Sequence, residues 1–140
     1  MTSTLLIASF AKKDSSEIKG DFYLGLIPTV APYLLPLFIE SFSTRYPKVN
    51  LIIDELKTDQ IIDSLKNGRI DAGILATPLL ESGINERPLY NEPLYAYFSQ
   101  GHPLLKKNIV GQKELAQHKE VWLLQDGHCF KNQMSQLCKK

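Results

Sequence analysis

Phe22-Tyr23-Leu24-Gly25-Leu26-Ile27 is a short and almost continuous apolar run, and Pro28 ends it. An uninterrupted run of this length is typical of a strand that is buried on both faces, as in a parallel sheet. A helix over residues 30–46 is predicted next, because apolar side chains recur at helical spacing at Leu34, Leu37, Phe38 and Phe42. The run therefore predicts the first strand and the first helix of an α/β unit.

The same alternation repeats further along the chain. Residues 49–56 are a second predicted strand, a helix follows from Thr58 to the Asn67-Gly68 stop, and residues 70–76 are a third strand. Strand, helix, strand, helix, strand within about 55 residues make two consecutive βαβ units, which imply parallel strands with right-handed crossovers. The sequence predicts an open, mostly parallel α/β sheet with flanking helices.

The segments outside these two units have weaker patterns. Residues 4–18 predict a helix that Gly20 stops, so we interpret this stretch as a connector. After Pro78 the sequence pattern changes, and a lobe boundary is expected near residues 90–95. A strand at 95–98, a short helix at 112–118 and a strand at 121–124, with Trp122 in the core, are the elements expected in the rest of the chain.

Composition and charge exclude several classes of protein. The chain has 140 residues, 44% of them hydrophobic and 22% charged, which is typical of an ordinary globular domain. Sixteen basic and fifteen acidic residues give a net charge of +1, so we do not expect the chain by itself to hold nucleic acid. The apolar stretch 5–11 is too short to span a bilayer and lacks the basic flank of a signal peptide. We expect no membrane contact and a cytoplasmic location.

Polar residues follow the predicted strands at the positions where ligands bind in α/β sheets. Thr29, Thr58, Thr77 and the turn at 127–129 all come directly after a predicted strand, which places them on one rim. Thr29 and Thr58 also precede helices, so N-capping is the alternative interpretation of each. Exposed N–H groups at such helix starts suit an anion or a small polar molecule.

Motifs for metals, cofactors and hydrolytic chemistry are missing from the sequence. The three histidines and two cysteines have no recognised metal-ligand spacing. No Gly-x-Ser-x-Gly elbow, phosphate-binding Gly-Lys-Ser/Thr loop or dinucleotide fingerprint is present. We therefore expect no metal and no cofactor.

The two cysteines have the local context of a redox pair. Cys129 follows Gly127-His128 at the predicted start of a helix, where the helix dipole, Lys131 and protonated His128 favour a thiolate. Cys138 is nine residues later, roughly 13–14 Å away and on the opposite face of such a helix. Because a disulfide needs Cα atoms about 4.4–6.8 Å apart, bond formation must refold the segment. The alternative is that Cys138 is a small core residue and Cys129 an ordinary loop thiol.

A resemblance to a known family covers the chain from about residue 20 to its end. Gly-Leu-Ile-Pro-Thr-Val-Ala-Pro-Tyr-Leu-Leu-Pro at 25–36, Asp-Gly-His-Cys at 126–129 and the spacing to Cys138 closely resemble the regulatory domain of the peroxide-sensing OxyR group of LysR-type transcription regulators. The resemblance implies a periplasmic-binding-protein-like, effector-binding fold. It divides the chain into the tail of a linker helix (1–19), a first lobe (20–92) and part of a second lobe (93–140).

The resemblance also implies roles for individual residues. Hydrogen peroxide would oxidise Cys129 to a sulfenic acid, Cys138 would condense with it to a disulfide, and residues 126–140 would be remodelled. Thr29, Thr58 and His128 match positions that line the peroxide pocket. Better-known members have Arg-Asp where this chain has Lys131-Asn132, which keeps one positive charge for tuning the thiol but loses a bidentate donor.

The partners implied by the resemblance are hydrogen peroxide and further copies of the regulatory domain. DNA would be contacted through an N-terminal winged helix-turn-helix, for which this sequence has no pattern, and the protein would be a sensor and not an enzyme. Two alternatives stay open. One is a LysR-type domain that binds a small metabolite and whose cysteines are incidental, and the other is a thiol peroxidase.

Overall fold

The described part of the chain is built around a mixed sheet. The structure is a computed structural model, and it describes residues 2–9, 18–77, 79, 81–93, 95–117 and 122. Within these residues five strands lie in the order β3-β2-β4-β1-β5. The strands are β1 (Thr2–Ser9), β2 (Gly20–Leu26), β3 (Val49–Glu55), β4 (Ala72–Thr77) and β5 (Glu86–Pro93).

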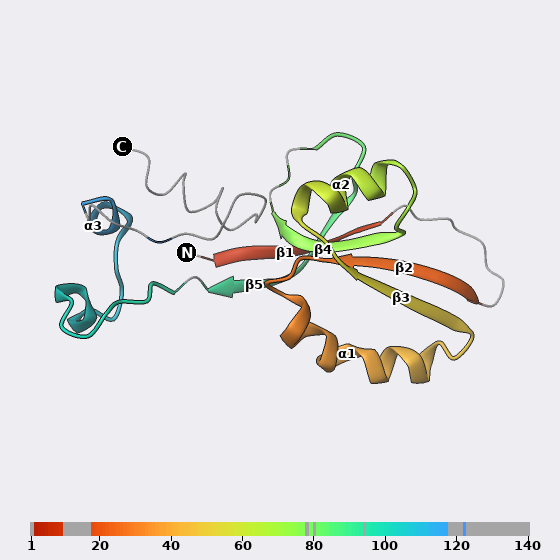
Figure 1. Cartoon of the computed structure of the whole chain (residues 1–140), viewed down its shortest axis with the longest axis horizontal. Coiled ribbons are helices and arrows are strands. Elements are labelled where there is room, and N and C mark those ends of the chain that lie inside the picture. The colour runs from red at the N-terminus through yellow and green to blue at the C-terminus, as the bar shows by residue number, and fades with distance from the viewer. Residues whose placement is uncertain are drawn as a thin grey trace.

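The two predicted βαβ units are confirmed. β2 pairs in parallel with β3 on one side and with β4 on the other. Helix α1 (Ala31–Arg45) connects β2 to β3, and helix α2 (Thr58–Lys66) connects β3 to β4. The two helices lie on opposite faces of the sheet (Figure 1). The parallel part of the sheet and its flanking helices thus confirm the α/β fold class that the sequence predicts.

The helix predicted over residues 4–18 is wrong for residues 4–9, which belong to β1. This strand runs antiparallel to both β4 and β5 and lies between them in the sheet. The run Leu5-Leu6-Ile7 is too short for its periodicity to distinguish helix from strand, so pairing with neighbours decides. β4 is buried at every position and offers those neighbours. The division into a connector and two lobes remains a prediction.

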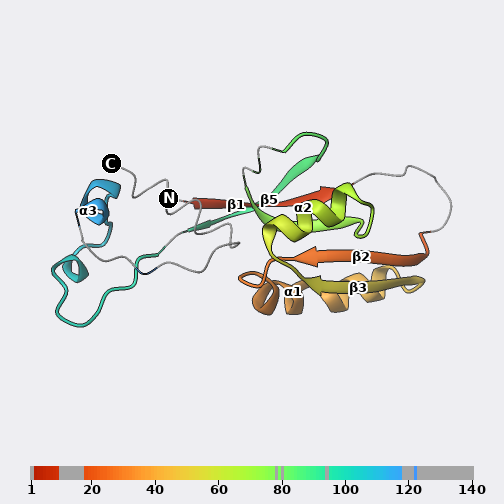
Figure 2. The same cartoon turned by 45° about the horizontal axis from the view of Figure 1, so that its top comes forward.

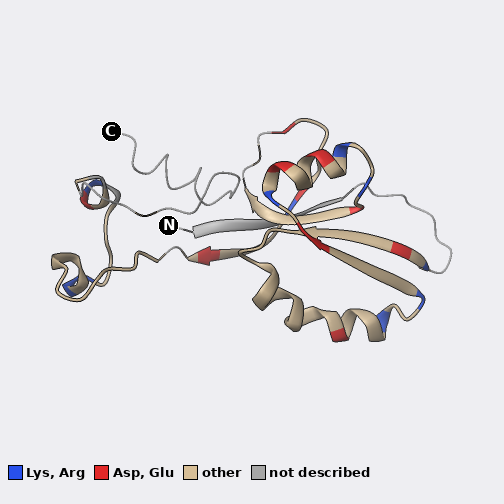
Figure 3. Cartoon of the chain, in the orientation of Figure 1, with Lys and Arg blue, Asp and Glu red and all other residues tan. Residues whose placement is uncertain are grey.

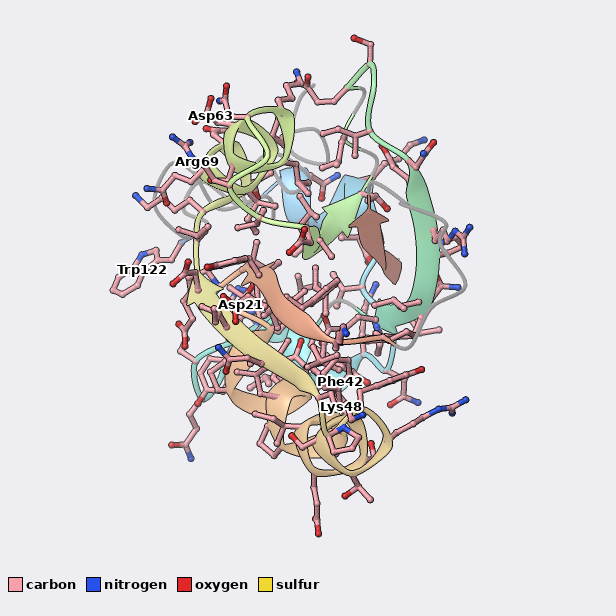
Figure 4. The ribbon with its side chains drawn as sticks, turned by 90° about the vertical axis from the view of Figure 1, so that its right-hand side faces the viewer. Asp21, Phe42, Lys48, Asp63, Arg69 and Trp122 are labelled. Carbon is pink, nitrogen blue, oxygen red and sulfur yellow. The ribbon has the colours of Figure 1, made fainter. Side chains whose placement is uncertain are left out.

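Beyond β5 the chain leaves the sheet (Figure 2). The strand predicted at 95–98 is wrong, since these residues form no regular element and β5 ends before them. A 3-10 turn, η1 (Pro103–Lys106), and helix α3 (Gln112–Ala116) follow, and α3 confirms the helix predicted at 112–118 in its first five residues. The core position predicted for Trp122 is also wrong, because its side chain is 95% exposed and points away from the rest of the molecule (Figure 4).

Two glycines let α2 approach the sheet closely. Gly25 on β2 and Gly73 on β4 are paired neighbours in the parallel ladder. A Cβ at position 25 would lie 2.9 Å from Ile70 Cδ1 and 3.3 Å from Ile61 Cγ1, and a Cβ at position 73 would overlap Ile61 Cγ2. Ile61, which is fully buried, occupies the space that two absent side chains leave. The glycine pair therefore sets how close α2 lies to the sheet.

Asp71 fixes the register that brings these glycines side by side. The Tyr23 backbone N–H donates to Asp71 Oδ2 at 2.8 Å, and the Asp71 N–H donates to the Tyr23 carbonyl at 2.8 Å. The second bond joins backbone atoms and extends the ladder between β2 and β4 by one residue, and the first adds a contact from the Asp71 side chain. A shift of β4 by one residue would turn Gly73 to the other face of the sheet and separate it from Gly25.

We predict that Gly73→Ala lowers the free energy of unfolding by about 1–3 kcal/mol, because the new methyl group overpacks against Ile61 Cγ2. The double variant Gly73→Ala/Ile61→Leu should recover part of the loss, since leucine has no Cγ2 branch. Urea unfolding followed by circular dichroism measures both. Gly111→Ala is the matched control, because a Cβ there meets only a Glu114 oxygen at 3.4 Å. A Gly73→Ala variant with the same free energy of unfolding as the parent would contradict the close packing of α2 on the sheet.

Candidate functional site

The carboxyl ends of the three parallel strands form one edge of the sheet. β2, β3 and β4 all end there, because each neighbouring pair is parallel. Thr29 follows β2, Thr58 follows β3, and Thr77 is the last residue of β4. The structure thus confirms that the three threonines lie at the ends of neighbouring strands. We call the residues at this edge the rim.

Backbone hydrogen bonds anchor the segments that carry Thr29 and Thr58. The Leu56 N–H donates to the Leu26 carbonyl at 2.9 Å, and the Ile27 N–H donates to the Ile74 carbonyl at 3.1 Å. These bonds continue the pairing of β2 with both neighbours past the end of the strand. Thr58 is two residues from one bond, and Thr29 is two residues from the other. The rim is therefore held by the sheet and does not depend on long loops.

Thr58 does not cap α2, and its hydroxyl is left unpaired. The helix begins at Thr58 itself, and the residue before it, Lys57, donates its backbone N–H to Gln60 Oε1 at 2.9 Å. Thr58 Oγ1 is buried and has no hydrogen-bond partner in the described part of the chain. A buried hydroxyl without a partner is costly, and a small polar molecule that reached this oxygen would supply the missing hydrogen bond.

Thr29 does not cap α1 either. The residue at the N-cap position is Val30, and no side chain makes a capping hydrogen bond to the helix. Thr29 lies in a tight turn that the Val30 N–H closes by donating to the Ile27 carbonyl at 3.0 Å, and its side chain is exposed. The capping interpretation is therefore wrong for both threonines. Thr77 is buried and already makes an interaction.

Three residues at the same edge were not singled out from the sequence. Tyr33, in the first turn of α1, donates its hydroxyl hydrogen to Glu92 Oε1 on β5 at 2.6 Å. The hydroxyl of Tyr90, on the same strand, is buried and has no hydrogen-bond partner within the described residues. No local pattern could have found this cluster, because Tyr33 and Glu92 are 59 residues apart in the sequence.

The cysteine segment lies outside the described residues. It includes His128, Cys129, Lys131 and Cys138, so the structure does not test whether these residues join Thr29 and Thr58 at the rim. Their roles remain predictions. Among the residues that are described, no group of three or more histidine, cysteine, aspartate or glutamate side chains is arranged to hold a metal ion.

Charged side chains of the described residues are interspersed and often paired. Figure 3 shows acidic and basic residues mixed along both helices and at the ends of strands. Asp63 and Arg69 form an ion pair and lie side by side (Figure 4), and Lys66 bonds Glu81 at 2.6 Å. Such exposed pairs contribute little to stability. None of the described helices combines the length and the apolar character needed to cross a bilayer.

Comparisons with known proteins link the chain to one family. It matches the family described as "LysR substrate binding domain" over residues 15–140. It is 38% identical over 130 residues to a Mycobacterium leprae protein named "Probable hydrogen peroxide-inducible genes activator", covering 93% of this chain and 42% of that protein. It is 32% identical over 133 residues to the Escherichia coli "DNA-binding transcriptional dual regulator OxyR", covering 95% and 43%.

A solved structure of an OxyR protein is also similar to this chain. The reduced form of OxyR from N. meningitidis superposes with a TM-score of 0.74 and 41% sequence identity. The alignment covers 86% of this chain and 58% of that one. The chain spans less than half the length of the two curated relatives described above.

We predict that Thr58→Val leaves the free energy of unfolding unchanged or raises it by up to about 1 kcal/mol, because no hydrogen bond is lost and a buried polar atom is removed. Thr58→Ser is the matched control, since it keeps the hydroxyl and removes the methyl group, and it should be the less stable variant. Chemical denaturation of all three proteins measures the difference. A loss above about 1 kcal/mol in Thr58→Val would mean that the hydroxyl has a partner in the folded chain.

Proposed function

The chain belongs to the LysR substrate-binding domain family, and we propose that it acts as the redox-sensing regulatory domain of an OxyR-like transcription regulator. In this proposal hydrogen peroxide is the effector, and Cys129 and Cys138 are the groups that record its presence. The observation that supports it most directly in the structure is the buried, unpaired hydroxyl of Thr58 at the rim. The relatives are named as activators and regulators, which supports sensing over enzymatic turnover.

The proposed chemistry needs two thiols and one molecule of peroxide. The Cys129 thiolate attacks one peroxide oxygen, the O–O bond breaks, and hydroxide leaves and is protonated to water. The Cys138 thiolate then attacks the sulfur of the Cys129 sulfenic acid, which releases a second water after proton uptake and forms the disulfide. Both electrons that reduce the peroxide come from the two cysteines, so the step requires no cofactor.

The rim residues have separate proposed tasks. Thr29 and Thr58 would hydrogen-bond the peroxide, and His128 would orient it against Cys129. Lys131 would favour the thiolate form by its positive charge. Peroxide is small, uncharged and able to both donate and accept hydrogen bonds, so hydroxyl groups suit it as well as they suit water. The N-terminus of α2 adds a positive potential at the place where negative charge leaves.

The rest of the regulator's function is also part of the proposal. Disulfide formation would remodel residues 126–140 and pass the signal on. Regulatory domains would assemble in the cytoplasm, and a separate DNA-binding region of the regulator would control the genes. The names of the relatives support this setting. A domain that senses a small metabolite at the same rim is the outcome to be distinguished, because it would not need the cysteines.

We predict that one equivalent of hydrogen peroxide links Cys129 to Cys138, and peptide mass spectrometry detects the crosslink as the loss of two hydrogens. Cys138→Ser should instead accumulate a sulfenic acid at Cys129 that a dimedone-type reagent labels. Cys129→Ser should give neither product. Two free thiols after treatment of the parent chain would rule the proposal out and favour the metabolite-binding alternative.

We predict that Thr58→Val slows the oxidation of Cys129 by peroxide roughly ten-fold, the effect of one lost hydrogen bond to a developing charge. Thr58→Ser keeps the hydroxyl and should react nearly as fast as the parent. Stopped-flow measurement of thiol loss gives the rate constants. The rate of alkylation by a maleimide serves as the control, because it does not use the rim and should be the same in all three proteins. An equal slowing of both reactions would assign Thr58 a structural role only.

A further inference from the structure

A hydrogen bond joins the first turn of α1 to the strand by which the chain leaves the sheet. Tyr33 lies four residues after Thr29 and donates to Glu92 Oε1 at 2.6 Å. Glu92 is the penultimate residue of β5, and beyond Pro93 the chain runs away from the sheet to η1 and α3 (Figures 1 and 2). This bond therefore connects the rim to the exit of the chain.

β5 pairs along its length with β1 but lies at the edge of the sheet among the described strands. It is the last strand in the sheet order and pairs with β1, which is itself antiparallel to β4. The pairing has an irregularity between Leu5 and Leu6, where the register shifts. Most β5 side chains are exposed, whereas those of β4 are all buried. An edge strand with so little burial exchanges its amide hydrogens by local opening, so one more hydrogen bond has a measurable effect.

Tyr90 lies on the same face of β5 as Glu92, because side chains two residues apart in a strand point the same way. Its hydroxyl is buried, makes no hydrogen bond of normal geometry within the described residues, and interacts with the Tyr33 hydroxyl. Partial burial and the hydrogen bond to the Glu92 carboxylate raise the pKa of Tyr33, and burial raises the pKa of Tyr90. Both shifts favour the protonated phenol, which is the form in which Tyr33 donates to Glu92.

We propose that Tyr33 and Glu92 form a latch that ties the helix following Thr29 to the strand by which the chain leaves the sheet. A shift of α1 by an occupant of the rim would move Tyr33, one turn after Thr29, and so strengthen or release β5. Tyr33 and Glu92 are positioning residues in this device and do not touch the reacting atoms. The signal that the latch would transmit rests on the proposed function, whereas the contact between Tyr33 and Glu92 does not.

Hydrogen–deuterium exchange of the reduced, full chain tests the latch. Tyr33→Phe should speed amide exchange in the peptide covering residues 86–93 roughly three- to ten-fold, with little change in α2. Glu92→Gln keeps an acceptor oxygen and should stay near the parent, whereas Glu92→Leu should behave like Tyr33→Phe. Tyr23→Phe is the matched control, since Tyr23 is similarly exposed at 38% against 43% and its recorded bonds with Asp71 use backbone atoms. Unchanged exchange of β5 in Tyr33→Phe would overturn the latch.

A second comparison separates the latch from the proposed function. In the parent chain, peroxide treatment that forms the Cys129–Cys138 crosslink should change β5 exchange, and Tyr33→Phe should abolish most of that change. If no crosslink forms in the parent, the redox proposal fails while the result on reduced protein still decides the latch. If the crosslink forms and β5 exchange responds equally in parent and Tyr33→Phe, the latch is not the transmitting contact and the inference is wrong.

Discussion

The packing of Ile61 against the Gly25–Gly73 pair is the contact on which the rest of the structure depends. Two neighbouring parallel strands lack side chains at the same level, and the fully buried Ile61 fills the space. This packing sets the distance of α2 from the sheet, and with it the position of Thr58, which lies one turn before Ile61. Backbone bonds from Leu56 and Ile27 anchor the segments that carry Thr58 and Thr29. The candidate site is therefore determined by the packing of the core.

The unpaired hydroxyl of Thr58 connects this packing to function. A threonine at the start of a helix ordinarily satisfies a backbone N–H, but here the N-cap position belongs to Lys57 and the Thr58 oxygen faces no protein partner among the described residues. The same edge carries Tyr33 and Glu92, whose hydrogen bond reaches the strand that leaves the sheet. The proposed binding rim and the Tyr33–Glu92 contact are thus placed about one helical turn apart.

Much of the fold could be predicted from the sequence because its signals are local. The apolar run 22–27 and the helical spacing of 30–46 depend on near neighbours, and both units appear as expected. Residues 4–9 could not be assigned in this way, since a short apolar run takes its structure from strands about 70 residues away. The threonines were found by their place after strands, but only the observed helix start could decide against capping.

The rate at which hydrogen peroxide oxidises Cys129, compared between the folded chain and the same chain in urea, tests most directly whether the fold builds a peroxide site. A thiol in an unfolded chain reacts as a free cysteine does, without the hydroxyls and helix ends of the rim. We expect the folded chain to react roughly a hundred-fold faster at equal pH, after correction for the effect of urea on free cysteine. Equal rates in the two states would contradict a sensing role for this fold.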